Sequence, residues 1–195
     1  MSTLTVARKD GRVAIAAEAL TTFDEVRLPP ENDAAPDKIF ALETARGPAY
    51  VGIVGYTAHY LVLRDALARM PDADLTSREG IFATFQDLHP VLKDDYYLLP
   101  ETGEEGDPYE SSQMSVLIAS PGGIFGVYDM REVHAYRRYW AMGSGSPYAL
   151  GAMWARYEAL DARALAETGA EAGCTFDRSS AGPIQSFELD LAEPS

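Results

Sequence analysis

The sequence predicts an α+β fold in which two antiparallel sheets pack face to face between pairs of helices. β-prone segments and helical stripes alternate in blocks, and the turns Asp10-Gly11 and Pro121-Gly122-Gly123 each separate two β-prone segments. Hydrophobic residues make up 47% of the 195 residues, which is enough for a sizeable core. Because no linker, repeat or low-complexity tract divides the chain, we expect a single domain over residues 1–195.

The first part of the chain is expected to form strands around one long loop. The Asp10-Gly11 pair suits a type I′ hairpin, and Arg46-Gly47-Pro48 is a second turn. Residues Thr21–Asp37 contain three prolines and five acidic residues, which predicts an irregular loop. The strands predicted here are Leu4–Lys9, Arg12–Ala17, Lys38–Leu42 and Ala49–Val54.

Two helices and an acidic loop are predicted next. Pro71 ends the first helix, and the second follows Thr76-Ser77-Arg78-Glu79, which has the spacing of a capping box. Pro90 is expected to kink the second helix, and Glu101–Glu110 is predicted to be a loop. The helical stripes are Tyr60, Leu63, Leu67 and Met70, and then Ile81, Phe85, Leu88 and Leu92.

The second half is expected to mirror the first, with strands followed by helices. Ser146 is predicted to cap a helix and Pro147 to occupy its first position. That helix carries the stripe Ala149, Met153, Tyr157 and Leu160, and Asp161–Ala172 is predicted as another helix. The predicted strands are Met114–Ser120, Ile124–Met130, Tyr136–Met142 and a closing strand marked by Phe187, Leu189 and Leu191.

The composition excludes several classes of partner. Asp and Glu number 30 against 16 Lys and Arg, and the resulting net charge of −14 disfavours nucleic acid and anionic membranes. The single cysteine, Cys174, excludes an internal disulfide framework and Cys-rich zinc modules. Arg8 precedes any apolar run, so no secretory segment is predicted, and no run approaches the roughly 18 apolar residues of a membrane span. We therefore expect a cytoplasmic protein.

Conventional catalytic motifs are missing from the sequence. The histidines His59, His89 and His134 are far apart and lack partners at metal-ligand spacing, so we expect no metal site. Gly143-Ser144-Gly145 lacks the third glycine of a dinucleotide loop, and neither a Walker A loop nor a GxSxG elbow occurs. No cofactor is therefore expected. The remaining candidate nucleophile is Ser2, a hydroxyl residue directly after the initiator methionine.

Several motifs around Ser2 resemble the proteasome β/HslV family of N-terminal nucleophile (Ntn) hydrolases. Residues Ser2–Ala16 look like the opening strand pair of the family, which begins with the nucleophile and returns toward an acidic residue, here Glu18. Lys38 opens a strand where the family places its catalytic lysine. The likeness extends from Ser2 to about Leu191.

Three further motifs occur in the family order. Val54-Gly55-Tyr56-Thr57-Ala58 resembles the glycine turn that donates an oxyanion N–H, and Gly143–Ala149 resembles the GSG-helix motif. Asp177 and Ser180 match a D-x-x-S supporting pair. The serine nucleophile, the acidic composition and the long Thr21–Asp37 loop are similar to the betaproteobacterial proteasome homologue, whereas the length resembles the HslV branch.

The resemblance implies a four-layer αββα sandwich and a peptidase site. Removal of Met1 would free the α-amine of Ser2, which would act as the base for the serine hydroxyl. Lys38 would stand beside the amine as a charged neighbour held by Glu18, and the Gly55 N–H would stabilise the oxyanion. The groups implied to support the terminus are Ser144, Asp177 and Ser180.

The resemblance also implies how a peptide substrate is held. Thr22, Gly55 and Thr57 would pair with an extended peptide by strand addition. Phe40, Ile53 and Thr57 would line an apolar first pocket, which predicts cleavage after medium hydrophobic residues. By analogy with HslV, backbone carbonyls near Cys174 and Asp177 are a candidate cation site, although no metal is expected.

The sequence departs from the family pattern at two positions. Ser2 replaces threonine and so lacks the methyl group that restricts χ1, which predicts a less preorganised nucleophile. Glu18 replaces aspartate, and its side chain, which must reach Lys38, is longer by one methylene group.

The family also implies an assembly and leaves alternatives open. Subunits would form a stacked double ring of six- or seven-membered rings, with unfolded protein as substrate and an AAA+ unfoldase as a possible partner. The Thr21–Asp37 loop would attract basic or unfolded substrates at an inner pore. The alternatives are a catalytically silent ring or scaffold subunit and a small-molecule Ntn amidase.

Overall fold

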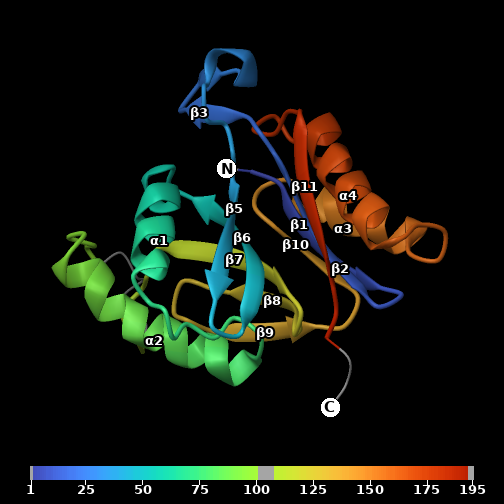
Figure 1. Cartoon of the computed structure of the whole chain (residues 1–195). Coiled ribbons are helices and arrows are strands. Elements are labelled where there is room, and N and C mark those ends of the chain that lie inside the picture. The colour runs from blue at the N-terminus through green and yellow to red at the C-terminus, as the bar shows by residue number, and fades with distance from the viewer. Residues whose placement is uncertain (1, 101–107, 193–195) are drawn as a thin grey trace.

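Two large antiparallel sheets stack between two pairs of helices in residues 2–100 and 108–192, which the computed structural model describes (Figure 1). Helices α1 (Ala58–Ala68) and α2 (Arg78–Asp94) cover one sheet. Helices α3 (Ser146–Arg156) and α4 (Ala162–Phe176) cover the other. The predicted αββα sandwich is therefore confirmed.

The four-stranded sheet carries the start of the chain and has the order β10-β1-β2-β11. Its strands are β1 (Leu4–Lys9), β2 (Arg12–Glu18), β10 (Tyr139–Met142) and β11 (Ile184–Asp190). Asp10 and Gly11, at φ +50° and +77°, turn the chain from β1 to β2 as predicted. Because β1 is an inner strand, Ser2 enters at the middle of the sheet rather than at its edge.

The five-stranded sheet has the order β5-β6-β7-β8-β9. Its strands are β5 (Ile39–Thr44), β6 (Gly47–Gly55), β7 (Met114–Ser120), β8 (Gly123–Val127) and β9 (Val133–Tyr136). Lys38 immediately precedes β5, and Gly55 is the last residue of β6. Both therefore lie at one end of the sheet, near the start of β1 in the facing sheet.

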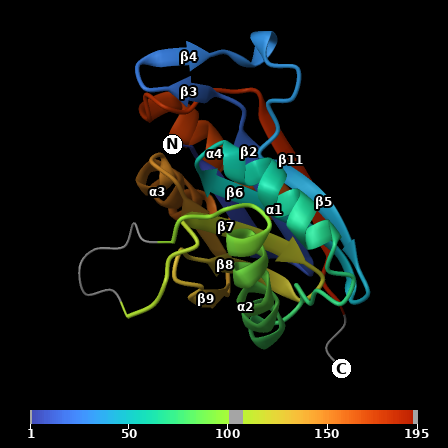
Figure 2. The same ribbon diagram turned by 90° about the vertical axis from the view of Figure 1, so that its left-hand side faces the viewer.

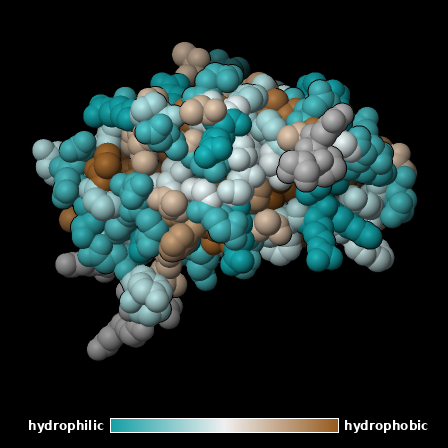
Figure 3. Space-filling view, turned by 60° about the horizontal axis from the view of Figure 1, so that its bottom comes forward, coloured by the Kyte–Doolittle hydropathy of each residue, from teal (hydrophilic) through white to brown (hydrophobic). Residues whose placement is uncertain are grey.

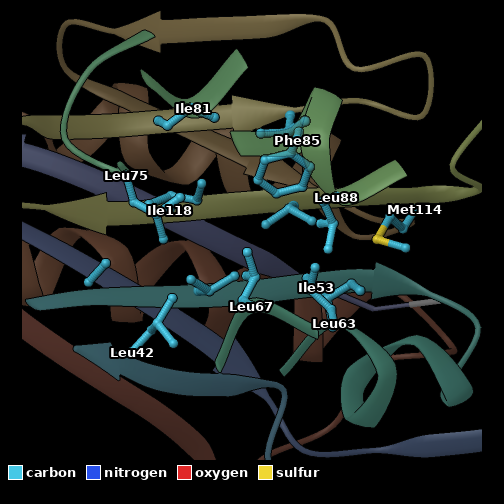
Figure 4. Packing of buried hydrophobic residues seen from close by; sticks show 14 of the residues in the cluster. Leu42, Ile53, Leu63, Leu67, Leu75, Ile81, Phe85, Leu88, Met114 and Ile118 are labelled. Atoms are coloured by element: carbon cyan, nitrogen blue, oxygen red, sulfur yellow. The ribbon is translucent and has the colours of Figure 1, made fainter. Parts of the chain in front are cut away.

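Three apolar clusters fill the spaces between the four layers. Leu63, Ile81 and Ile118 belong to the cluster between α1, α2 and the five-stranded sheet (Figure 4). Leu4 and Leu117 belong to the cluster between the two sheets. A third cluster, rich in alanine, joins the four-stranded sheet to α3 and α4. Burial of apolar surface on every inner face stabilises the stack.

Two segments differ from the strands that the sequence predicts. The Thr21–Asp37 stretch is not wholly irregular: β3 (Thr21–Phe23) pairs with β4 (Val26–Leu28), and a 3₁₀ turn spans Pro30–Asn32. Residues Tyr136–Met142 were expected as one strand, but β9 and β10 belong to different sheets. The predicted Glu101–Glu110 loop lies largely outside the described residues.

Two helix starts also differ from the prediction. Ser77, not Thr76, caps α2, and its hydroxyl accepts a hydrogen bond from the Gly80 N–H at 3.0 Å. Helix α3 begins at Ser146 itself, so Gly145 is the N-cap residue. Both shifts are of one residue and leave the helices in the predicted places.

The surface is mostly hydrophilic, in keeping with the many charged residues of the sequence. Figure 3 shows a mostly hydrophilic face with smaller hydrophobic patches between hydrophilic side chains. Among the helices of residues 2–100 and 108–192, none is both long and apolar enough to cross a bilayer.

Candidate active site

A cleft of about 1020 Å³ opens at the end of the sandwich where β1 begins. Figure 2 shows the start of the chain below the β3–β4 hairpin and beside α3. Ser2, Lys38 and Gly55 all line this cleft, so residues far apart in the sequence meet there. A concave site that gathers titratable and hydroxyl groups is the first candidate for catalysis in this fold.

Ser2, Lys38 and Glu18 form a continuous chain of contacts. The Lys38 Nζ donates to the Ser2 Oγ at 3.1 Å and also donates to a carboxylate oxygen of Glu18. Ser2 is 7% exposed, and the Glu18 side chain is fully buried. The sequence therefore identified three groups that the fold brings into direct contact.

Glu18 is held by donors on both of its oxygens. Oε1 faces Lys38 and the Thr3 N–H, and Oε2 accepts from the Leu20 N–H at 2.8 Å and the Ala181 N–H at 3.2 Å. This fixed carboxylate holds the ammonium group in place, together with the Leu20 carbonyl at 2.6 Å. The longer glutamate side chain thus reaches Lys38.

The electrostatics of Lys38 follow from its position. Burial lowers the pKa of Lys38 below the ordinary lysine value, and Glu18 opposes that shift. A lysine in this setting is a positive charge placed against the Ser2 hydroxyl, where it favours a developing alkoxide.

A second group of predicted residues meets around Asp177. Its Oδ2 accepts hydrogen bonds of 2.7 Å from the hydroxyls of Ser144 and Ser180. Burial by itself raises the pKa of Asp177, but these hydrogen bonds outweigh it and bring the pKa below the ordinary value. The ionised form of Asp177 is therefore favoured next to the cleft.

Thr3 links the two groups and was missed by the sequence analysis. Its Oγ1 lies 2.8 Å from the Ser180 Oγ, and its N–H points to Glu18. A Cβ on Gly145 or Gly173 would come within about 2 Å of the Thr3 hydroxyl. These two glycines therefore give room for Thr3, a tertiary contact for which the sequence offers no local signal.

Gly143 brings the backbone close to Ser2. It has φ +94°, and a Cβ there would lie 2.1 Å from the Ser2 carbonyl oxygen. The same oxygen accepts from the Gly145 N–H at 3.3 Å. The glycines of the GSG motif thus hold the Ser2 backbone rather than a phosphate.

The predicted substrate-binding residues divide into two sets. Thr22 and Thr57 line the cleft together with Gly55, whose φ is +134°. Phe40 and Ile53 do not line it; they are 5% and 6% exposed and pack in the cluster beneath α1 and α2. The structure thus does not bring Phe40 and Ile53 to the Ser2 cleft, because their side chains point to the helix-covered face of the sheet.

One wall of the cleft is anchored by groups that the sequence analysis did not connect. Buried Arg131 donates to the Glu110 carbonyl at 2.8 Å and to the Ser112 hydroxyl at 3.2 Å. His89 Nδ1 lies 3.0 Å from the same hydroxyl. Because the next residues, Ser111 and Gln113, line the cleft, this network fixes its wall.

The described residues were also searched for metal ligands. No group of three or more His, Cys, Asp and Glu side chains within residues 2–100 and 108–192 is arranged to hold a metal ion. The Cys174 thiol has its pKa raised to about 11, by burial first and by Glu18 second. A cation bound by carbonyls near Cys174 and Asp177 stays a prediction.

Solved structures resemble the whole chain. BPH, a bacterial proteasome homologue from Thiobacillus denitrificans, is 42% identical, with a TM-score of 0.89 over 98% of this chain and 100% of that one. A second BPH structure, in complex with epoxomicin, is 41% identical over the same shares and has a TM-score of 0.88.

A more distant structure shares the fold alone. Eukaryotic HslV from Trypanosoma brucei is 16% identical, with a TM-score of 0.69 over 96% of this chain and 99% of that one. Neither a protein-family model nor a curated protein matches the chain.

Proposed function

The chain belongs to the proteasome/HslV family of N-terminal nucleophile hydrolases, and we propose that it is an endopeptidase whose nucleophile is Ser2. The observation that carries this proposal is the 3.1 Å contact from Lys38 Nζ to Ser2 Oγ, with Lys38 paired to buried Glu18. We propose that the catalytic domain spans residues 1–195 and that Met1 is removed.

The first chemical step is acylation of Ser2. The Ser2 Oγ attacks the peptide carbonyl carbon while its proton passes to the free α-amine, whose ordinary pKa is about 7.7–8.0. Lys38 stabilises the alkoxide as it forms, and the Gly55 N–H donates to the tetrahedral oxyanion. The C–N bond then breaks, and the leaving amine takes the proton held by the α-ammonium.

The second step releases the product. Water attacks the acyl carbon while the α-amine accepts a proton from that water. The ester C–O bond then breaks, the proton passes from the α-ammonium to the Ser2 Oγ, and the carboxyl product leaves. Ser144 and Ser180 both donate to Asp177, and Ser180 also contacts the Thr3 hydroxyl, so this group supports the terminus during both steps. Thr22, Gly55 and Thr57 supply the edge along which the substrate backbone pairs.

The test is covalent labelling by a peptide epoxyketone such as epoxomicin, read by intact mass. We expect a mass lacking Met1 plus one reagent per subunit, and hydrolysis of unstructured peptides. Ser2→Ala removes labelling and hydrolysis, whereas Ser186→Ala, which removes a hydroxyl that is bound to Glu167 of α4 and does not line the cleft, keeps both. Processed protein that is never labelled would instead indicate a silent scaffold subunit, and hydrolysis by Ser2→Ala would exclude this nucleophile.

The proposed assembly is a stacked double ring of six- or seven-membered rings in the cytoplasm. Its support is the family itself, since the likeness to BPH covers the whole chain. Native mass spectrometry is expected to give twelve or fourteen copies, and an AAA+ unfoldase is a possible partner for folded substrates. A monomer by light scattering would contradict the enclosed chamber.

A further inference from the structure

The cleft around Ser2 carries uncompensated negative charge. Among the described residues that line it, Lys38 is the only basic one, and Glu18 already pairs with that lysine. Asp24 and Asp129 also line the cleft, both are exposed, and neither forms a salt bridge within the described part of the chain. A substrate therefore meets two carboxylates without a salt-bridge partner and, among the described residues that line this cleft, no basic side chain other than the paired Lys38.

The two carboxylates belong to separate, structured segments. Asp24 sits in the turn between β3 and β4 with φ +53°, and it follows lining residues of β3. Asp129 follows β8, and its carbonyl accepts from the Ser112 N–H at 2.6 Å. The Arg131 and His89 network holds Ser112 in turn. Defined backbone contacts thus place both carboxylates.

Two exposed aromatic side chains line the same cleft as these carboxylates. Phe23 and Tyr56 line the cleft and are 59% and 70% exposed. Lysine and arginine combine an aliphatic stem with a charged head, so they cover aromatic surface while the head reaches a carboxylate. The apolar pair expected to select hydrophobic residues, Phe40 and Ile53, is buried elsewhere.

We propose that Asp24 and Asp129 are specificity-determining residues that select peptides carrying Lys or Arg in the segment bound along the cleft. The proposal rests on the proposed peptidase function and names its substrate class. Exposed ion pairs of this kind change affinity by about 2- to 5-fold each, and salt weakens them. The net charge of −14 attracts cations to the whole molecule, so a test must separate local from general attraction.

The test compares fluorogenic peptides that differ only by Lys or Gln at one position, scanned across the scissile bond. At the selecting position, wild type is expected to prefer Lys by about 4- to 25-fold in kcat/KM, the product of two such pairs. Asp24→Asn and Asp129→Asn each lower that preference, and the double variant abolishes it. Asp87→Asn, an equal loss of charge on the exposed face of α2, leaves it unchanged.

Binding to the Ser2→Ala protein, measured by fluorescence anisotropy, tests the same selection without turnover. Tighter binding of the Lys peptide, lost in the Asp24 and Asp129 variants, supports the selection even where nothing is cleaved. Cleavage with no Lys preference at any position overturns it while leaving the peptidase intact. An equal loss of preference in Asp87→Asn overturns it as well, because the attraction is then general.

Discussion

Replacing Glu18 by glutamine is expected to destabilise the protein by about 3–5 kcal/mol, because it leaves a buried ammonium without its counterion. Glu18 is fully buried, and the Lys38 side chain is 13% exposed. Both carboxylate oxygens face only donors, from Lys38 and from three backbone N–H groups. In Glu18→Gln the amide nitrogen would therefore face another donor at either oxygen position, and the negative charge would also be lost.

Urea unfolding followed by circular dichroism measures this effect at fixed subunit concentration. Lys38→Met removes the stranded charge, so the double variant Glu18→Gln/Lys38→Met is expected to recover most of the stability lost in Glu18→Gln. Epoxyketone labelling is lost in both variants, since neither places a positive charge held by a carboxylate against Ser2. A loss below 1 kcal/mol, or additive effects in the double variant, would refute the ion-pair reasoning.

Two further substitutions test how the terminus is held. Gly143→Ala, at φ +94°, places a Cβ 2.1 Å from the Ser2 carbonyl oxygen, so epoxyketone labelling is expected to fall at least 10-fold. The control is Gly11→Ala, which also has a positive φ, +77°, but open space around the Cβ, and therefore tests backbone strain alone. Equal labelling of the two variants would argue against the contact with Ser2. Asp177→Asn removes a carboxylate whose pKa the fold lowers. A carboxylate whose pKa is lower in the folded state contributes its full stabilisation above its pKa in the unfolded state, which is near 3.8. That stabilisation is lost as the pH falls through the lower pKa of the folded state. The stability difference from wild type is thus expected to shrink below about pH 4 in acid-unfolding curves, and a difference that does not change with pH would contradict the shift.

The elements that the sequence predicted well are those with local signals. Asp10 and Gly11 adopt the left-handed angles that a two-residue hairpin requires, and the helical stripes of α1 and α2 face the five-stranded sheet. The β3–β4 hairpin was missed because prolines and acids dominate Thr21–Asp37, although Phe23 and Val26 flank a two-residue turn. The composition of the whole segment indicated a loop, although a short strand–turn–strand pattern lies within it.

The elements that the sequence analysis predicted wrongly depend on tertiary context. Nothing local marks Arg137 and Arg138 as the point where the chain leaves one sheet for the other, since the flanking residues are β-prone on both sides. The same limit applies to the site. The order of motifs along the chain identified Ser2, Glu18 and Lys38, but Thr3 and the Ala181 N–H act only through contacts made across the fold.

The placement of Ser2 makes its chemistry dependent on how the two sheets stack. Ser2 precedes β1 of the four-stranded sheet, whereas Lys38 precedes β5 of the five-stranded sheet, so their 3.1 Å contact crosses the interface between the sheets. A Cβ on Gly52 of β6 would lie 2.5 Å from the Leu4 side chain, which shows how closely the sheets approach beside that contact. Close-packed interiors shift as units rather than yielding locally. The cluster between the sheets therefore sets the distance between Ser2 and Lys38, so the family fold and the proposed catalytic contact depend on the same packing.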